Sequence, residues 1–312
     1  MLDFLQVKRS RDMQKSVIKR KGFSWEALKK AIKPHSLQQH IEDTRKRFNV
    51  LITGRRFGKS RYLLRRLIRE AINYKGVYDL ASPPVIIIGM PTFGMVRRIH
   101  WKQLVSLLSD CPLVANIDRT NLVIDFLGDR PAIVCIGLND DNGDRTRGLR
   151  LYGACIDEVQ SIKHGIIDTV IMPALLDTPD SFLDCTGTPK GKANTAYKLF
   201  EKAKEDPDIW SAFLYKTIDN PTLPPGVIDT LRRLLDDRTF RQEAEASFEE
   251  FIGQIFYAFD RDKHKKHNSV IKSNIYFLGV DWGDRYPAYC VIGATSRQSE
   301  LFNYSYHYMN TG

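Results

Sequence analysis

A glycine-rich loop follows the first strongly apolar run of this 312-residue chain. Its residues are Thr53, Gly54, Arg55, Arg56, Phe57, Gly58, Lys59 and Ser60. The loop is a variant of the pattern G-x-x-x-x-G-K-[ST], because Thr53 stands where the pattern has its first glycine. Inward-pointing backbone N–H groups and the positive end of a following helix attract phosphates. We therefore expect the loop to bind ATP, with Lys59 at the β- and γ-phosphates and Ser60 on Mg²⁺.

Two carboxylates end a second apolar run, Leu151–Ile156. We expect Asp157 to hold Mg²⁺ through water, and Glu158 to orient and deprotonate the attacking water. Taken alone, Gly-Lys-Ser at a helix start can arise by chance, and an Asp-Glu pair can simply cap a helix. Both groups follow predicted strands, and this combination favours a catalytic site over the two alternatives.

A third group of small residues follows the next predicted strand. Thr186, Gly187 and Thr188 permit a tight turn near the nucleotide, and the two hydroxyls are placed to sense its γ-phosphate. An ordinary strand-to-loop turn has the same composition. Only the presence of the two preceding motifs favours a coupling role for these residues.

Alternating strands and helices are predicted around these motifs. The expected strands are Phe48–Thr53, Val85–Met90, Ala132–Ile136, Leu151–Ile156, Phe182–Cys185 and Ser211–Tyr215. The expected helix Ser60–Tyr74 has apolar residues at the 3.6-residue period. This alternation predicts an α/β fold with a mostly parallel sheet covered on both faces. The core spans residues 48–216, and a basic, mostly helical segment, 1–47, precedes it.

The pattern changes after the last of these strands. A Pro-rich connector, residues 219–226, precedes a helix expected over Val227–Phe248, and both belong to a linker subdomain, 217–270. Residues 271–312 contain consecutive strands with short turns, which indicate a second domain. The strands expected there are Tyr276–Trp282, Tyr289–Thr295 and Leu301–Tyr308.

The composition favours a soluble enzyme with a polyanionic partner. The net charge of +10 favours nucleic acid first and an anionic membrane second. No stretch approaches the roughly 20 apolar residues that span a bilayer, and no signal-peptide-like run begins the chain. The five cysteines form no CxxC pair, so we expect reduced core residues and a cytoplasmic location.

The order and spacing of the motifs resemble the large terminase subunits of tailed bacteriophages along nearly the whole chain. Gln38 precedes Arg47-Phe48 at the spacing of the family's adenine-contacting glutamine. GRRFGKS, RGLRLYGACIDE and TGTPKG resemble its phosphate loop, Walker B and coupling motifs, and Met90–Trp101 resembles its second strand-to-helix passage. The segment 279–283, GVDWG, resembles the first strand of its ribonuclease-H-like nuclease domain.

This resemblance implies an ATP-hydrolysing motor that translocates double-stranded viral DNA into a preformed capsid, with a nuclease that cuts the DNA concatemer. It implies a homo-oligomeric ring on the capsid portal, a small terminase subunit as partner, and the host cell cytoplasm as the location. It also implies an arginine that completes an ATP site. The candidates are Arg55 or Arg56 within the loop, and Arg97 or Arg98 across subunits.

The nuclease domain is expected to be incomplete in this sequence. Two-metal cleavage with Mg²⁺ or Mn²⁺ needs several carboxylates, and the metal ligand Asp281 is followed only by Asp284 and Glu300. We expect the remaining acids beyond Gly312, because the chain is truncated or the gene is split, and endonuclease activity only from the full-length protein. The fold prediction is therefore a P-loop NTPase followed by the incomplete start of a ribonuclease-H-like domain.

A superfamily 2 helicase-like, DNA-dependent ATPase is the alternative. It would need a second RecA-like domain with arginine fingers, whereas consecutive strands are expected after residue 268. A basic DNA-binding protein with an inactive nucleotide fold is a further alternative, and the intact Lys59, Asp157 and Glu158 argue against it.

Overall fold

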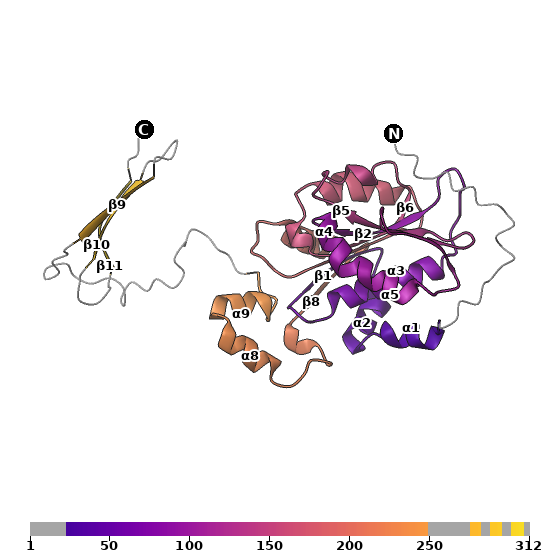
Figure 1. Ribbon diagram of the computed structural model, residues 1–312, viewed down its shortest axis with the longest axis horizontal. Helices are drawn as coiled ribbons and strands as arrows, with labels where there is room; N and C mark the ends of the chain where they lie inside the picture. The colour runs from indigo at the N-terminus through magenta and orange to yellow at the C-terminus, as the bar shows by residue number, and fades with distance from the viewer. Residues whose placement is uncertain (1–22, 249–274, 282–287, 295–300, 309–312) are drawn as a thin grey trace. The chain divides into compact units, whose positions relative to one another are not determined.

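The computed structural model describes residues 23–248, together with the backbone of three later strands within 275–308 (Figure 1). The chain divides into two compact units, Met1–Phe251 and Ile252–Gly312. The four-part division expected from the sequence stays a prediction. Within the described residues, no helix combines the length and the apolar character that crossing a membrane requires.

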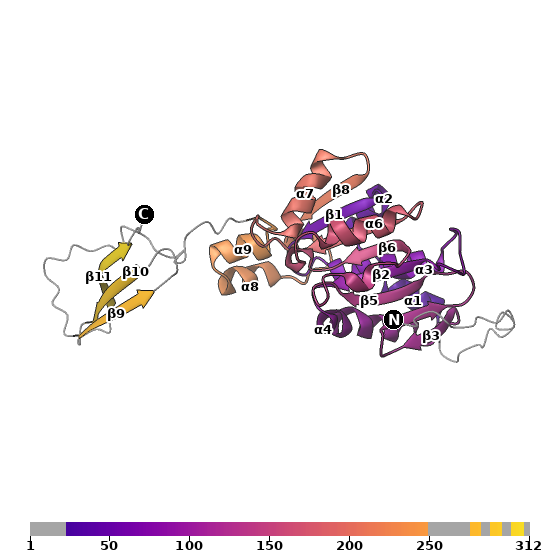
Figure 2. The same ribbon diagram turned by 90° about the horizontal axis from the view of Figure 1, so that it is seen from above.

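The first unit is built on one eight-stranded sheet (Figure 2). Its strands are β1 (Phe48–Thr53), β2 (Val85–Met90), β3 (Val114–Asp118), β4 (Val123–Phe126), β5 (Ala132–Gly137), β6 (Leu151–Ile156), β7 (Phe182–Gly187) and β8 (Trp210–Tyr215). Their order across the sheet is β3-β4-β5-β2-β6-β7-β1-β8. All neighbours from β5 to β8 in this order pair in parallel, so the predicted mostly parallel α/β fold is confirmed.

Two details of the sheet differ from the sequence prediction. The antiparallel strands β3 and β4 at one edge were not expected, because the exposed edge strand β3 mixes polar residues with apolar ones. Strand β7 runs to Gly187, beyond the expected end at Cys185. Thr186 and Gly187 therefore belong to the strand, and Thr188 alone of the three lies in the loop.

The main difference between the observed helices and the predicted ones lies after β8. The helices are α1 (Trp25–Ala31), α2 (Ser36–Thr44), α3 (Lys59–Ile72), α4 (Phe93–Val96), α5 (Lys102–Leu108), α6 (Met172–Leu176), α7 (Thr195–Glu205), α8 (Val227–Leu234) and α9 (Asp237–Glu243). Helix α3 differs from the expected helix by one residue at its start and two at its end. The single helix expected over 227–248 is wrong, because α8 and α9 are separate. The Asp236 side chain accepts hydrogen bonds from the N–H groups of Arg238 and Thr239, and so it caps a new helix.

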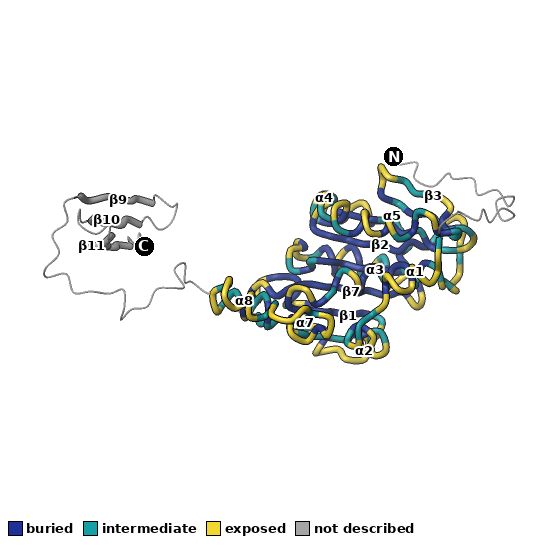
Figure 3. Tube along the Cα trace, turned by 60° about the horizontal axis from the view of Figure 1, so that its bottom comes forward, coloured by how far each residue is buried: buried dark blue, intermediate teal, exposed yellow. Residues whose placement is uncertain are grey.

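Two apolar clusters cover the two faces of the sheet. Ile86 and Ile88 of β2 pack into one cluster with residues of α3 and α5. Ile87, which points to the opposite face, packs into the other cluster with residues of α6 and α7. Strands that are buried on both faces are continuous apolar runs, which is why they were recognisable in the sequence. Figure 3 shows these strands as buried, with the exposed residues on the surrounding helices and loops.

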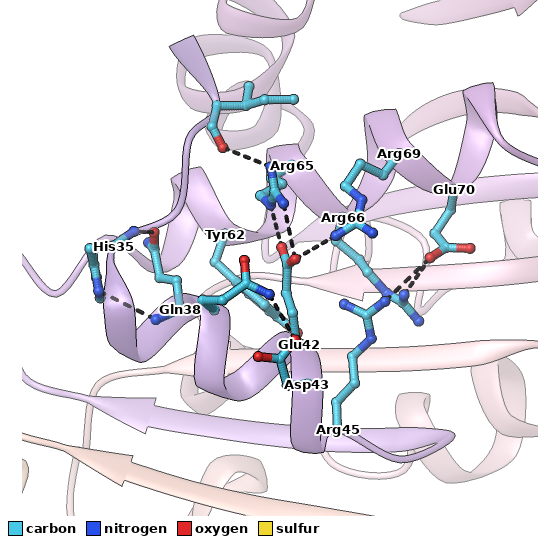
Figure 4. A network of polar contacts seen from close by, with 12 residues as sticks. His35, Gln38, Glu42, Asp43, Arg45, Tyr62, Arg65, Arg66, Arg69 and Glu70 are labelled. Carbon is cyan, nitrogen blue, oxygen red and sulfur yellow. Dashed lines mark hydrogen bonds and ion pairs between the residues drawn. The ribbon is translucent and has the colours of Figure 1, made fainter. Parts of the chain in front are cut away.

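An ion network fastens α2 to α3 (Figure 4). The Glu42 carboxylate of α2 is 3% exposed and pairs with Arg65 and Arg69 of α3. From the same helix, Arg66 reaches the fully buried Asp184 of β7, with a distance of 3.2 Å between Nε and Oδ2. Buried charges are costly unless they are paired. The network therefore joins three elements that approach the phosphate loop: α2, α3 and β7.

The second unit contains β9 (Ile275–Asp281), β10 (Ala288–Ala294) and β11 (Leu301–Tyr308). They form an antiparallel sheet in the order β11-β10-β9. The three consecutive strands expected from the sequence are confirmed, with ends that agree to within one residue. The ribonuclease-H-like character stays a prediction. Asp281 is the last residue of β9, and its side chain lies outside the described residues, as do Asp284 and Glu300.

Candidate active site

The glycine-rich loop connects the carboxyl end of β1 to the start of α3. Gly58 is the N-cap of α3 and has φ +103°, which an L side chain rarely adopts. A Cβ atom there would also lie 2.7 Å from Nε2 of Gln38. The position therefore needs glycine for both its backbone and its space. No side chain caps the first turn of α3, so its N–H groups point toward a site where phosphate oxygens can bind.

The Lys59 ammonium group lies in a buried polar niche beside this loop. Its residue is 9% exposed. Its Nζ donates to Oγ1 of Thr188 at 2.9 Å and lies 3.4 Å from Oγ1 of Thr53. Burial lowers the pKa of Lys59, while the nearby carboxylate of Asp157 opposes that shift. A buried cation with two neutral hydroxyl partners is well placed to gain from a phosphate counter-charge.

Asp157 follows β6 directly and is the hub of the site. It is 2% exposed. Its Oδ2 accepts hydrogen bonds from Oγ of Ser60 at 3.0 Å and Nε2 of His100 at 2.9 Å. Its Oδ1 accepts one from Oγ1 of Thr186 at 2.8 Å. Burial alone would raise the pKa of Asp157, but the hydrogen bonds from His100 and Thr186 and the charge of Lys59 keep it below the usual value. The carboxylate is therefore ionised.

The residues Ser60 and Asp157 fit a magnesium ion. They bring a hydroxyl and a carboxylate oxygen to 3.0 Å of each other at the start of α3. Hard oxygen ligands of this kind suit Mg²⁺, which is commonly bound through one or two protein groups while phosphates and water complete its octahedral shell. The fold thus brings Ser60 and Asp157 together, and their role in binding Mg²⁺ stays a prediction.

Glu158 has an unusual backbone beside the metal pair. Its φ of +56° is in the left-handed region, where a non-glycine residue is strained. Its half-buried carboxylate accepts a hydrogen bond from Nε2 of Gln160. Both residues line an open pocket of about 750 Å³ above the loop. Glu158 therefore lies at the pocket with a strained backbone, and its role as the base stays a prediction.

The segment after β8 forms another wall of this pocket. Leu231 of α8 and Glu243 of α9 line it. The backbone N–H of Arg55 donates to the Glu243 carbonyl at 2.7 Å, and the Arg55 guanidinium pairs with the Glu243 carboxylate. Oγ1 of Thr217 donates to the Arg55 carbonyl at 2.8 Å, and Nδ2 of Asn220 donates to the Arg56 carbonyl at 2.7 Å. The segment between Thr217 and Glu243 therefore holds the backbone of the phosphate loop directly.

Gln38 lies behind the loop on α2. It is 1% exposed, its Nε2 donates to the Gly58 carbonyl at 3.0 Å, and its Oε1 accepts from the N–H of His35 at 3.1 Å. Phe57 is fully buried and stacks on Tyr215, with ring centroids 5.0 Å apart. Both side chains thus support the loop from within the protein. A hollow of about 530 Å³ adjoins them, and the predicted adenine contact of Gln38 stays a prediction.

The remaining arginine candidates lie apart from the pocket. Arg97 and Arg98 are exposed on a π-helical turn, Arg97–Trp101, between α4 and α5. Neither lines the pocket above the loop, whereas Arg55 and Arg56 do. The structure thus separates the candidates into a pair at the site and a pair on the surface.

Sequence reasoning missed several residues that the fold brings to the site. His100 lies two positions after Arg98, in a segment that was noted for its arginines and for its resemblance to a strand-to-helix passage. Gln160 lies two positions after Glu158. Glu243 was noted only as part of the linker. His100 shares the buried face of the helical segment after β2 with Val96 and Leu104. This spacing was the sequence signal that could have identified His100 as buried.

Similarity to known proteins is found in both sequence and structure. No family model matches the chain. Its sequence is 27% identical over 259 residues to the large terminase subunit of Escherichia phage T5. The matched region covers 79% of this chain and 56% of that protein. The chain therefore spans about half the length of this curated relative.

The similar structures are phage large terminases. The ATPase domain of the Thermus phage P74-26 large terminase matches with a TM-score of 0.57 and 20% identity, over 70% of this chain and 94% of that one. The large terminase of a thermophilic bacteriophage matches with a TM-score of 0.60 and 17% identity, over 89% and 69%. Structures of this second protein with ADP and with ATP-γ-S are also similar. The chain has the fold of large terminase ATPase domains, and the resemblance expected from its motifs is confirmed.

Proposed function

We propose that this chain, which has the fold of large terminase ATPase domains, hydrolyses ATP and drives double-stranded viral DNA into a preformed capsid. The observation that carries the proposal is the convergence of Lys59, Ser60 and Glu158 on one pocket, with Asp157 hydrogen-bonded to Ser60, and we assign Ser60 and Asp157 to Mg²⁺ binding. Because the start of α3 and the end of β6, which lie far apart in the sequence, supply these groups, their meeting is not a consequence of local sequence.

The chemistry assigned to these residues is in-line attack of water on the γ-phosphate. Lys59 neutralises charge on the β- and γ-phosphates, and Glu158 orients the water and accepts its proton. Ser60 and Asp157 hold Mg²⁺, which neutralises further phosphate charge when it is bound. Arg55 or Arg56 supports the same charge from within the loop, and Arg97 or Arg98 acts on the site of a neighbouring copy.

The contacts of the phosphate loop support a route from hydrolysis to movement. Thr186 and Thr188 connect β7 to Asp157 and to Lys59, and Glu243 connects α9 to Arg55. A change in the phosphates therefore alters partners on both elements. We assign the coupling role to Thr186, Gly187 and Thr188, and the moving part to the linker subdomain, 217–270.

The partners and the second activity follow from the similarity to terminases. They are double-stranded DNA, a small terminase subunit, a capsid portal and further copies of the chain in a ring, in the host cell cytoplasm. Adenine contacts Gln38 in this proposal. A ribonuclease-H-like domain that begins within 271–312, with Asp281 as one ligand of Mg²⁺ or Mn²⁺, cuts the DNA concatemer in the full-length protein.

The test is ATP hydrolysis by the purified chain, with and without double-stranded DNA. Lys59→Ala should lower the rate at least ~100-fold, because transition-state charge loses a preorganised partner. The matched control is Lys204→Ala, since Lys204 is an exposed lysine that contacts Glu201 and the Phe200 ring of its own helix and does not line the pocket; this variant should hydrolyse ATP at the wild-type rate. Equal rates for both variants would refute the assignment of the loop, and a rate indifferent to DNA would refute the translocation function.

A further inference from the structure

His100 is a fully buried histidine that no part of the proposed chemistry uses. It belongs to the π-helical turn Arg97–Trp101, and its exposed fraction is 0%. Its buried helical neighbours are apolar: Val96, Trp101 and Leu104. An apolar side chain would suit this environment without a desolvation cost. The presence of an imidazole there therefore calls for a reason other than packing.

The hydrogen bonding of the His100 ring identifies that reason. Nε2 lies 2.9 Å from Oδ2 of Asp157, and because the carboxylate can only accept, Nε2 carries the proton. Nδ1 is buried and has no hydrogen-bond partner among the described residues. An unsatisfied buried polar atom costs roughly 1–3 kcal/mol. His100 thus leaves the buried Nδ1 without a hydrogen bond, which costs free energy. Its Nε2 makes one hydrogen bond, to the Asp157 carboxylate.

We propose that His100 is a positioning residue, which fixes the orientation of the Asp157 carboxylate so that it receives Mg²⁺. The inference rests on the ATPase function proposed above. Oγ1 of Thr186 and the backbone N–H of Glu158 hold Oδ1, and His100 holds Oδ2, so donors on both oxygens fix rotation about the Cβ–Cγ bond of Asp157. Ser60 also donates to Oδ2, but its oxygen is the second metal ligand.

His100 acts through Asp157 and does not touch the reacting atoms. Partners of this kind orient the groups that bind a metal, and their replacement typically costs about 10- to 100-fold in metal affinity or activity. The π-helical turn is consistent with such a role, because single π turns inside α-helices occur frequently at functional sites. Here the turn bears the imidazole that reaches the end of β6.

The experiment measures nucleotide binding and not hydrolysis. ATP-γ-S is titrated into the whole chain by calorimetry, once with Mg²⁺ and once with EDTA, and the ratio of the two dissociation constants gives the contribution of the metal. Four variants are compared: His100→Ala, His100→Gln, His100→Asn and Leu104→Ala. Glutamine places an N–H donor near the position of Nε2, whereas asparagine places it near Nδ1. Leu104 is fully buried on α5, so its truncation controls for a loss of packing.

The expected result is a split between these variants. His100→Ala and His100→Asn should lose about 10- to 100-fold of the Mg²⁺-dependent gain in affinity, with unchanged affinity in EDTA. His100→Gln and Leu104→Ala should keep the wild-type ratio, although Leu104→Ala should unfold at a lower temperature. Thermal unfolding in EDTA accompanies each titration.

Three outcomes would overturn the proposal. The first is a wild-type ratio in His100→Asn, and the second is a loss in His100→Gln as large as in His100→Asn; these comparisons stand even if His100→Ala does not fold. The third is an equal loss in Leu104→Ala, which would make His100 a packing residue. If the wild-type chain itself binds no ATP-γ-S, the proposed ATPase function fails, which is a different result from a variant that binds normally.

Discussion

Replacing Gly58 with alanine tests how the phosphate loop is held. The backbone at φ +103° should cost an alanine about 1–2 kcal/mol. The new Cβ would lie 2.7 Å from Nε2 of Gln38, so the amide must move and lose its 3.0 Å hydrogen bond to the carbonyl of residue 58. Leaving these buried groups unpaired costs about 1–3 kcal/mol. A gain of about 0.4–1 kcal/mol from the less flexible unfolded chain offsets part of this, so the free energy of unfolding should fall by about 2–4 kcal/mol.

Gly165 offers a matched control for the backbone cost. It also has a positive φ, +87°, but a Cβ there would have Thr169 Cγ2 at 4.0 Å as its nearest neighbour. Gly165→Ala should therefore cost only about 1 kcal/mol. At roughly 2–4 °C for each kcal/mol in a domain of this size, Tm should fall by about 4–16 °C for Gly58→Ala and about 2–4 °C for Gly165→Ala.

Calorimetric unfolding of the two variants measures this difference, and ATP-γ-S titration should show weaker binding for Gly58→Ala alone. Adding Gln38→Ala gives a double-mutant cycle with an expected coupling energy of about 1–3 kcal/mol. Equal losses of Tm for Gly58→Ala and Gly165→Ala, or a coupling energy near zero, would refute the argument that Gln38 holds the loop.

Three further predictions concern the same site and the binding of DNA. Thr186→Val should lower the free energy of unfolding by about 1.5–3 kcal/mol, because it removes a hydrogen bond to the ionised Asp157. Thr178→Val should be neutral or stabilising, because Oγ1 of Thr178 is buried without a hydrogen-bond partner among the described residues; urea unfolding of both variants distinguishes them, and a similar loss in each would contradict the prediction. Glu158→Gln should bind ATP-γ-S with near wild-type affinity yet hydrolyse ATP at least ~100-fold more slowly, since an amide cannot accept the proton; lost binding with residual turnover would instead reverse the roles of Asp157 and Glu158. DNA binding, followed by fluorescence anisotropy, should weaken steeply between low and physiological salt with little sequence preference, and a flat salt response would count against a translocating motor.

Much of the architecture was predictable because its determinants are local. Strands β1, β2 and β6 are continuous apolar runs, and a parallel strand that is buried on both faces requires such a run. Asp157 directly follows β6, and the phosphate loop that leads to Lys59 directly follows β1. Since the carboxyl ends of parallel strands share one edge of a sheet, the predicted parallel sheet places the phosphate loop and Asp157 at the same edge.

The failures of prediction lie where local and long-range forces compete. The helical pattern over 227–248 continues through Asp236, but the side chain of Asp236 caps a new helix and ends the old one. Strands β3 and β4 carry no continuous apolar run, because they lie at an edge of the sheet. The register and order of strands across the sheet depend on which faces pack together, and neighbouring residues do not encode that directly.

The sequence by itself determined the phosphate loop, the acidic strand end and the parallel sheet, because each depends on residues that are adjacent or regularly spaced. Only the tertiary structure decided that His100, 57 positions from Asp157 in the chain, supplies a hydrogen bond to the metal-binding carboxylate. It likewise decided that Glu243, 188 positions from Arg55, holds the phosphate loop. Contacts over such separations form only when the packing of whole helices against the sheet offsets the entropy of closing long loops. A local sequence pattern can therefore predict that a side chain is functional, but it does not predict which distant residue that side chain contacts.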